Sequence, residues 1–172
     1  MPVVSDANIL SSLAAADALD LLAKLFRGDK ILIPQAVERE LQAGLSYGAA
    51  HLQRIFQAIA KGEIQVLHLT EVEQALTQTL PHKLHAGEKE GIILCQSHNY
   101  LFLSNDKRAV QYCQTIGIKT INLEALLRSL WVQQFCSQQE VKALIQAMQA
   151  VEKLIMTPEQ LAKIFAPYSR KR

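Results

Sequence analysis

The stretch that decides the fold is Pro2-Val3-Val4-Ser5-Asp6-Ala7-Asn8-Ile9-Leu10. A short run of β-branched residues ends in the polar pair Ser5-Asp6, and a helical pattern of apolar residues begins directly after it. In an α/β protein, such a strand ends at the carboxyl edge of a parallel sheet, where open sheets bind their ligands. Asp6 is therefore expected where a functional site is most easily built.

Strand and helix patterns alternate along the rest of the chain. Further short strands are predicted at residues 30–34, 64–69, 100–104 and 118–122. The helical region after Asn8 is expected to break near Asp17, and Gly44 is expected to end the helix that begins at Gln35. The alternation predicts a parallel sheet with helices on both faces. From Leu123 onward the pattern is helical throughout, with a basic tail at 170–172.

Length and composition indicate one globular domain. The 172 residues suffice for a single sizeable core, and 18 basic against 16 acidic residues leave a net charge of +2. This balance neither requires nor excludes a nucleic-acid partner. The three cysteines lie in apolar helical patterns, which indicates buried thiols in a reducing compartment. No apolar run has the length of a membrane span, so a cytoplasmic location is expected.

Acidic residues fall at the ends of the predicted elements. Asp6 and Asp106 each follow a strand, so both should face one crevice at the same edge of the sheet. Glu88 and Glu90 open the helix before the fourth strand, and Glu40 reaches the crevice only if its helix leans across the edge. Clustered carboxylates repel one another unless a cation neutralises them, and Mg²⁺ prefers oxygen ligands. The acids therefore favour metal-assisted hydrolysis of a phosphodiester.

Each acid also has a purely structural interpretation. Asp6 and Asp106 are good helix N-caps. Glu88 and Glu90 suit the positive end of a helix, where each contributes about 0.3–1 kcal/mol without any metal. Glu40 would be an ordinary solvated side chain. The joint order and spacing of the acids, rather than any one of them, favours a site.

Four motifs, in this order, resemble those of the PIN domain family, and in particular the bacterial and archaeal proteins related to the toxin nucleases of toxin–antitoxin pairs. The motifs are Val4-Ser5-Asp6-Ala7-Asn8-Ile9-Leu10, Ile33-Pro34-x-x-Val37-x-x-Glu40-Leu41, Gly87-Glu88-Lys89-Glu90-Gly91-Ile92 and Leu103-Ser104-Asn105-Asp106-Lys107-Arg108-Ala109. No single motif is specific, but four in register are. The resemblance covers roughly Pro2 to Asn122. It implies a three-layer α/β/α sandwich with a central parallel sheet, in a single domain over 1–172 whose helical C-terminal extension is 123–172.

The resemblance also implies a site. The acidic positions of the family map onto four residues that would bind Mg²⁺ or Mn²⁺ and carry catalysis: Asp6, Glu40, Glu90 and Asp106. Supporting roles are expected for Asn8, Ser104, Asn105 and Glu88, and phosphate contacts for Lys107, Arg108 and Lys89. Glu88 and Glu90 are two apart on a helix and do not share a face. Motif position favours Glu90 in the crevice, with Glu88 on the rim.

The favoured function is a Mg²⁺- or Mn²⁺-dependent endoribonuclease, a toxin or toxin-like hydrolase of RNA. Its expected partners are a cognate antitoxin protein and a second copy of the chain in a homodimer. The alternative is an inactive PIN-fold module that binds nucleic acid or a protein, because Asn105 stands where many members carry an aspartate. A phosphatase with Asp6 as nucleophile fits less well, since Asn8 occupies the place of the usual second aspartate.

Overall fold

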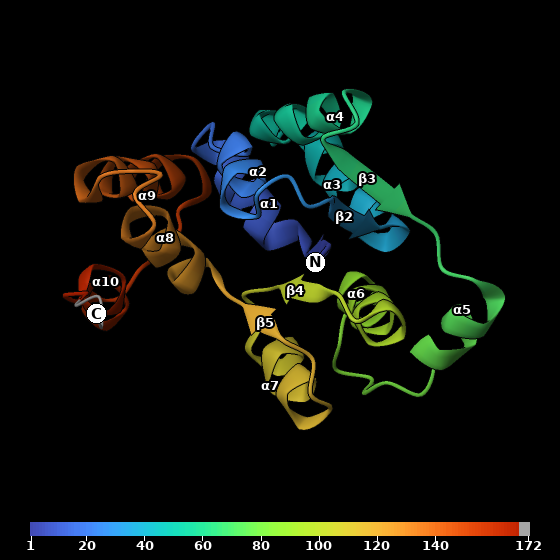
Figure 1. Ribbon diagram of the computed structural model, residues 1–172. Coiled ribbons are helices and arrows are strands. Elements are labelled where there is room, and N and C mark those ends of the chain that lie inside the picture. Colours follow the sequence, from blue (N-terminus) through green and yellow to red (C-terminus); the bar gives the residue numbers. More distant parts are fainter. Residues whose placement is uncertain (169–172) are drawn as a thin grey trace.

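The computed structural model describes residues 1–168, so the predicted basic tail at 170–172 lies outside the described residues. Within that range, five strands form one parallel sheet in the order β3-β2-β1-β4-β5 (Figure 1). The strands are β1 Val3–Ser5, β2 Ile31–Pro34, β3 Ile64–Leu67, β4 Leu101–Leu103 and β5 Thr120–Ile121. The parallel sheet predicted from the alternating pattern is confirmed.

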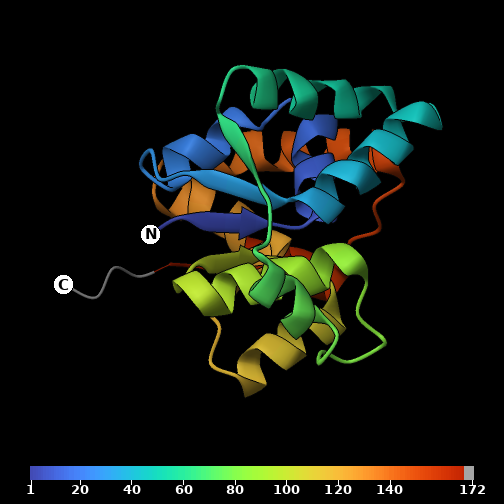
Figure 2. The same ribbon diagram turned by 90° about the vertical axis from the view of Figure 1, so that its right-hand side faces the viewer.

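Helices cover both faces of this sheet, which confirms the three-layer sandwich. They are α1 Ala7–Ala15, α2 Asp20–Leu25, α3 Gln35–Ser46, the 3₁₀ helix η1 Ala50–Leu52, α4 Gln53–Ala60, α5 Glu71–Thr77, α6 Ala86–His98, α7 Lys107–Thr115, α8 Leu123–Val132, α9 Gln138–Glu152 and α10 Pro158–Phe165. In Figure 2, α1 to α4 lie above the sheet, and α6 and α7 lie below it.

Successive side chains of each strand enter two different cores. Val3 and Leu103 pack into the core that takes in α1 to α4 and α8 to α10, whereas Val4 and Phe102 pack into the core under α6 and α7. All four side chains are fully buried. The strands point alternate residues to opposite faces, and both faces are covered. This is why the strands read as continuous apolar runs.

Two predictions about helix ends had different outcomes. The break at Asp17 is confirmed, because α1 ends before Asp17 and its backbone has a φ of 53°. The stop at Gly44 was wrong, since α3 continues to Ser46. A Cβ atom at Gly44 would lie 2.8 Å from Cδ1 of Leu52. Gly44 therefore lets η1 pack closely against α3.

The order of the strands reverses at β1. The chain builds β1, β2 and β3 in one direction and then returns to place β4 on the other side of β1. Ser5 pairs with Leu103, and the backbone N of Asp6 donates to the carbonyl of Leu103 at 2.9 Å. Ligands bind at such switch points in open α/β sheets, beyond the carboxyl ends of the strands. Asp6 leaves β1 at this place.

The helices after residue 122 pack on the first core. Arg128 of α8 donates to three carbonyl groups at the end of α10, including Ala166 O at 2.7 Å. Trp131 Nε1 donates to Ile164 O at 2.8 Å, and Ile164 is fully buried. The cation Arg128 also lies over the ring of Trp131, 5.4 Å from its centroid. These contacts hold α10 against α8.

The cysteines are free thiols. Cys95 and Cys113 are buried as predicted, whereas Cys136 is only half-buried, which corrects its prediction. Burial raises the pKa of the Cys113 thiol to about 11, so this group stays protonated at neutral pH. Among the described residues, no helix combines the length and apolar character that crossing a membrane requires.

Candidate active site

A pocket of about 260 Å³ opens beyond the carboxyl ends of β1 and β4. Its carboxylates come from four separate segments of the chain: Asp6 after β1, Glu40 in α3, Glu88 in α6 and Asp106 before α7. The lining is completed by Ala7, Asn8, Val37, His85 and Gly87. The structure therefore brings Asp6, Glu40 and Asp106 into one pocket and adds Glu88 as the fourth acid.

Asp6 is the most deeply placed of these acids, with 4% of its surface exposed. Its Oδ1 accepts from the backbone N of Ile9 at 2.8 Å, which caps α1, and its Oδ2 accepts from the backbone N of Asn105 at 3.2 Å. Burial raises the pKa of Asp6 above its ordinary value. Hydrogen bonds from Ile9, Ser104 and Asn105 lower that pKa in part, and the charge of Glu40 raises it again.

Asp106 is held by the first turn of α7. Its Oδ1 accepts from the backbone N of Arg108 at 2.8 Å and of Ala109 at 2.9 Å. Its own backbone N donates to Oγ of Ser104 at 3.1 Å, and the buried hydroxyl of Ser104 also bonds Asp6. Ser104 thus lies between the two aspartates, and the supporting role implied for it stays a prediction.

Glu88 is the glutamate of α6 that faces the pocket. Only 8% of its surface is exposed, and its Oε2 accepts from the backbone N of His85 at 2.9 Å. Burial raises the pKa of Glu88, the hydrogen bond from His85 opposes this, and the charges of Asp106 and Asp6 raise the pKa further. A carboxylate surrounded in this way gains from a neighbouring positive charge.

Glu90 points elsewhere, so the expectation that it faces the crevice was wrong about its placement. Its Oε2 accepts from the backbone N of Ala36 at 2.9 Å, and its Oε1 lies 3.4 Å from Nη2 of Arg39. Both partners belong to α3, where Glu90 satisfies the first turn of the helix. Two residues along a helix separate side chains by more than a right angle, so only one of Glu88 and Glu90 faces the pocket.

Two glycines set the position of α6. A Cβ atom at Gly87 would lie 2.8 Å from Cγ2 of Val37 and 3.5 Å from Oε2 of Glu40. At Gly91 it would lie 2.7 Å from Cε2 of Phe102. The missing side chain of Gly87 lets α6 approach α3 closely enough to place the exposed Glu40 beside the pocket.

The supporting and basic residues are divided between several places. Asn8 lines the acidic pocket as expected. Oδ1 of Asn105, for which a supporting role was expected, accepts from the backbone N of Leu123 at 2.8 Å at the start of α8. Lys107, Arg108 and Lys89 do not line the acidic pocket. Lys107 lines a hollow beside Asn105, and Arg108 lines one beside α7 and Leu84.

The donors of the acidic pocket fit a hard divalent cation, because they are carboxylates whose charges disfavour one another. Across residues 1–168, no three His, Cys, Asp or Glu side chains are grouped as a ready metal cluster. Mg²⁺ commonly binds through one or two carboxylates and completes its coordination with water and phosphate oxygens. The pocket therefore supplies carboxylates of the kind that such an ion binds, namely those of Asp6, Asp106, Glu88 and Glu40.

Glu152, at the end of α9, has a place near the site that sequence reasoning missed. It accepts from the hydroxyl groups of Ser11 and Ser12, the latter at 2.7 Å, and lies 3.3 Å from Nε2 of His51. Together with Asn8 and Asp106 it lines a hollow of about 420 Å³ next to the acidic pocket. The local sequence around Glu152 is that of an ordinary helix end and gave no signal.

Fold and site together define an α/β/α protein with a carboxylate pocket at the switch point of its parallel sheet. A family model described as a PIN domain matches residues 2–169, and the chain belongs to the PIN domain family. PIN domains are generally nucleases and typically use divalent metals. A comparison with curated proteins finds no match at the required level of similarity.

Proposed function

We propose that the protein is a metal-dependent endoribonuclease, with Asp6, Glu40, Glu88 and Asp106 as its active-site acids. One observation carries the proposal: in a PIN domain, four carboxylates from four segments line a single pocket at the switch point of the sheet. Two of them, Asp6 and Glu88, have raised pKa values because they are buried close to other acids. This charge arrangement suits Mg²⁺ or Mn²⁺ as cofactor.

The protein's own contribution is to position the acids. A divalent ion bound there supplies the charge that activates water and stabilises the oxygens of a phosphodiester during hydrolysis. Asp6 and Asp106 are fixed by backbone donors from Ile9, Asn105 and the first turn of α7. Glu40 is exposed and free to adjust to the substrate. Lys107, adjacent to Asp106, would hold a phosphate of the RNA strand.

The resemblance to toxin nucleases supports a finer form of this proposal. In that form the protein is a toxin-like RNase, inhibited by a cognate antitoxin protein and assembled as a homodimer. Light scattering on the purified protein should give twice the 19.2 kDa mass of the chain. A monomer at micromolar concentration would contradict the dimer without touching the proposed chemistry.

The sharpest test of catalysis is Asp106→Asn. An asparagine keeps the oxygen that caps α7 but removes the charge, so the fold should persist. Cleavage of RNA in Mg²⁺ should fall roughly 100-fold or more, since even outer partners of a metal are worth about 10–100-fold. The matched control is Asp29→Asn, an exposed acid before β2 at the opposite end of the strands, which should cleave like the wild type.

Cleavage should also stop with a chelator and return with added Mg²⁺ or Mn²⁺. Titration calorimetry with Mn²⁺ provides the second readout, and Asp106→Asn should weaken the binding that the wild type shows. RNA cleavage by Asp106→Asn at the wild-type rate would disprove the assignment. A wild type that neither binds Mn²⁺ nor cleaves RNA would favour the inactive binding module instead.

A further inference from the structure

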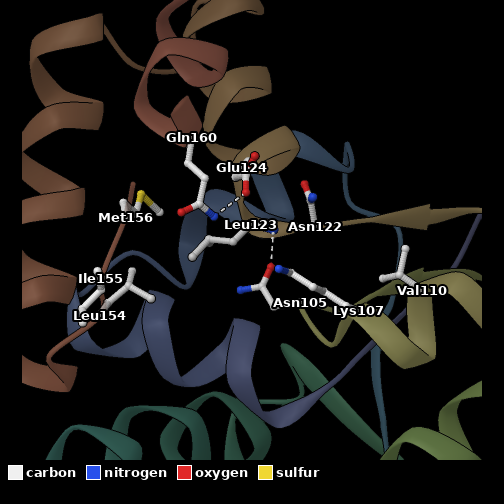
Figure 3. A pocket seen from close by; sticks show the side chains of 10 residues that line it. All are labelled: Asn105, Lys107, Val110, Asn122, Leu123, Glu124, Leu154, Ile155, Met156 and Gln160. Carbon is white, nitrogen blue, oxygen red and sulfur yellow. Dashed lines mark hydrogen bonds between the residues drawn. The ribbon is translucent and has the colours of Figure 1, made fainter. Parts of the chain in front are cut away.

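A second hollow, of about 220 Å³, is lined in part by Asn105, whose backbone N donates to Asp6 of the acidic pocket. Figure 3 shows it between the turn before α7, the start of α8 and the loop that joins α9 to α10. Its walls are largely apolar and include Leu123, Leu154 and Ile155, and 85% of the surface of Ile155 is exposed. Polar groups enter from both sides: Asn105 and Lys107 on one, and Asn122, Glu124 and Gln160 on the other. An exposed apolar wall with a few polar groups is typical of a ligand site.

A third hollow lies between this one and the acidic pocket and shares lining residues with both. The hollow that contains Glu152 shares Asn105 and Leu154 with the apolar hollow, and it shares Asn8 and Asp106 with the acidic pocket. A chain of three adjoining depressions therefore crosses the carboxyl edge of the sheet. Glu152 lies along this path, and its carboxylate accepts hydrogen bonds from the hydroxyl groups of Ser11 and Ser12.

The loop that forms the apolar wall is fixed at both of its ends. At one end, Glu152 is bonded to α1 through Ser12 at 2.7 Å. At the other end, Nε2 of Gln160 donates to Glu124 at 2.6 Å, and Oε1 of Gln160 accepts from the backbone N of Thr157 at 2.8 Å. These contacts hold the two ends of the loop that carries the apolar wall, and holding the ends lowers the entropy cost of ordering the loop on binding.

We propose that this hollow binds one base of the RNA strand, next to the phosphodiester that is cleaved; the inference rests on the proposed ribonuclease function. The volume lies below the range of about 300–1,000 Å³ typical of drug-sized ligands, so a single ring system suits it. Proteins bind single-stranded RNA by stacking splayed bases on aromatic rings or Arg planes, and here aliphatic side chains would offer the apolar contact surface instead. Leu123, Leu154 and Ile155 provide such surfaces.

The polar groups match a nucleotide as well. Oδ1 of Asn105 is engaged by Leu123 N, and Figure 3 shows its Nδ2 directed toward Leu154 and Ile155. That amide nitrogen is a donor for a carbonyl oxygen on the edge of a base. Lys107 extends beside Asn105 in the same view and suits the adjoining phosphate. Asn105 therefore serves the substrate side of the site instead of the metal.

The test measures binding of labelled RNAs of about eight nucleotides, within the usual range of about 4–16 per site. Each RNA lacks one base at a different position, and Ca²⁺ replaces Mg²⁺ so that binding is measured without depending on turnover. For the wild type, removal of the base at one position should weaken binding at least about fivefold, as expected for the loss of buried apolar contact surface. In the Ile155→Ala variant, the fold-loss of affinity caused by removing that base should be at most half as large as in the wild type. The control, Val72→Ala, removes an exposed apolar side chain from α5 and should leave this fold-loss unchanged.

Cleavage of the same RNAs in Mg²⁺ separates this proposal from the one on which it rests. Position-dependent binding that Ile155→Ala reduces supports the base site, even if no RNA is cleaved. Cleavage with binding that is equal for all positions overturns the base site and leaves the ribonuclease intact. The base site is also overturned if Ile155→Ala leaves the loss of affinity on base removal unchanged. It is overturned as well if the hollow binds a partner peptide but no base.

Discussion

The side chain of Asp6 and the backbone of Asn105 are joined by a hydrogen bond of 3.2 Å across 99 positions of sequence. This bond uses Oδ2 of Asp6, while Oδ1 accepts from the backbone N of Ile9 at 2.8 Å. Asp106 differs, because both of its bonds to the backbone of α7 end on Oδ1. Asp6 therefore uses both of its carboxylate oxygens as acceptors for backbone N–H groups, whereas Asp106 uses only one.

This difference predicts unequal effects of asparagine on stability. Both variants remove a charge that neighbouring acids disfavour, but Asp6→Asn also turns an NH₂ group toward one backbone donor, so its free energy of unfolding should lie about 1–2 kcal/mol below that of Asp106→Asn. In Asp106→Asn the change of cap should alter the free energy of unfolding by less than about 0.5 kcal/mol, since asparagine caps helices as well as aspartate does. Urea unfolding without divalent ions measures both. An Asp106→Asn protein less stable than Asp6→Asn would contradict the assigned hydrogen bonds.

Glu88→Gln and Glu90→Gln form a matched pair that tests which glutamate serves the site. Each glutamine keeps the oxygen that accepts a backbone hydrogen bond, from His85 N or from Ala36 N, and removes the charge. Glu88→Gln should lower Mg²⁺-dependent cleavage by about 10-fold or more, because its carboxylate faces the pocket. Glu90→Gln should stay within about twofold of the wild type. A larger loss of cleavage in Glu90→Gln than in Glu88→Gln would instead place Glu90 in the site, as the family motif implies.

Gly91→Ala should destabilise the protein although alanine favours helices. The gain in helix propensity is about 1 kcal/mol. Against it, the new methyl would lie 2.7 Å from the ring of the fully buried Phe102, and overpacking costs about 1–3 kcal/mol. We expect a net loss of about 1 kcal/mol in thermal or urea unfolding. In the double variant with Phe102→Leu, the loss should be smaller than the sum of the single losses.

The stability contributed by Glu73 should depend on pH. A hydrogen bond from the backbone of Thr70 lowers the pKa of Glu73 from its ordinary value of 4.5, the buried position opposes this, and Ser97 and His98 lower the pKa further. A lowered pKa means that the stabilisation is complete above the unfolded-state pKa and disappears as the pH falls through the folded-state pKa. Glu73 is thus predicted to stabilise the protein at neutral pH and not in acid.

Glu73→Ala measures this contribution. Near neutral pH, the variant should lose about 1 kcal/mol of unfolding free energy, the usual value of a helix cap. The difference from the wild type should shrink as the pH falls below the ordinary value of 4.5. Glu71→Ala, at an exposed position in the same turn, should show little of this dependence. If the difference in unfolding free energy between the wild type and Glu73→Ala grows as the pH falls, the pKa of Glu73 is not lowered in the folded protein.

The sheet and the two aspartates could be predicted because their signals are local. A strand that ends in an acid is visible in the chain itself, as at Asp6 and Asp106. The choice between Glu88 and Glu90 could not be predicted, since it depends on the rotation of α6. That rotation is set where Gly91 meets Phe102 and where Gly87 meets α3, and these contacts join distant segments.

The same reasoning explains the other differences between prediction and structure. Gly44 was expected to end a helix, but its close contact with Leu52 is a tertiary effect that helix propensity does not contain. The place of Glu152 depends on the docking of α9 against α1 through Ser11 and Ser12. The sequence shows that Asn105 follows β4, but it does not show the hydrogen-bond partner of its side chain, because that partner is Leu123 at the start of α8.

The central strand β1 has consequences for synthesis on the ribosome. It is the first of the five strands along the chain, yet its neighbour β4 begins at Leu101, and the core beside it includes Ile164 of α10. A nascent polypeptide that stops before Leu101 holds Asp6 without the strand that positions Asp106. Under the proposed function, assembly of the acids must therefore wait until the chain beyond Asp106 has emerged, so shorter nascent chains lack the complete pocket.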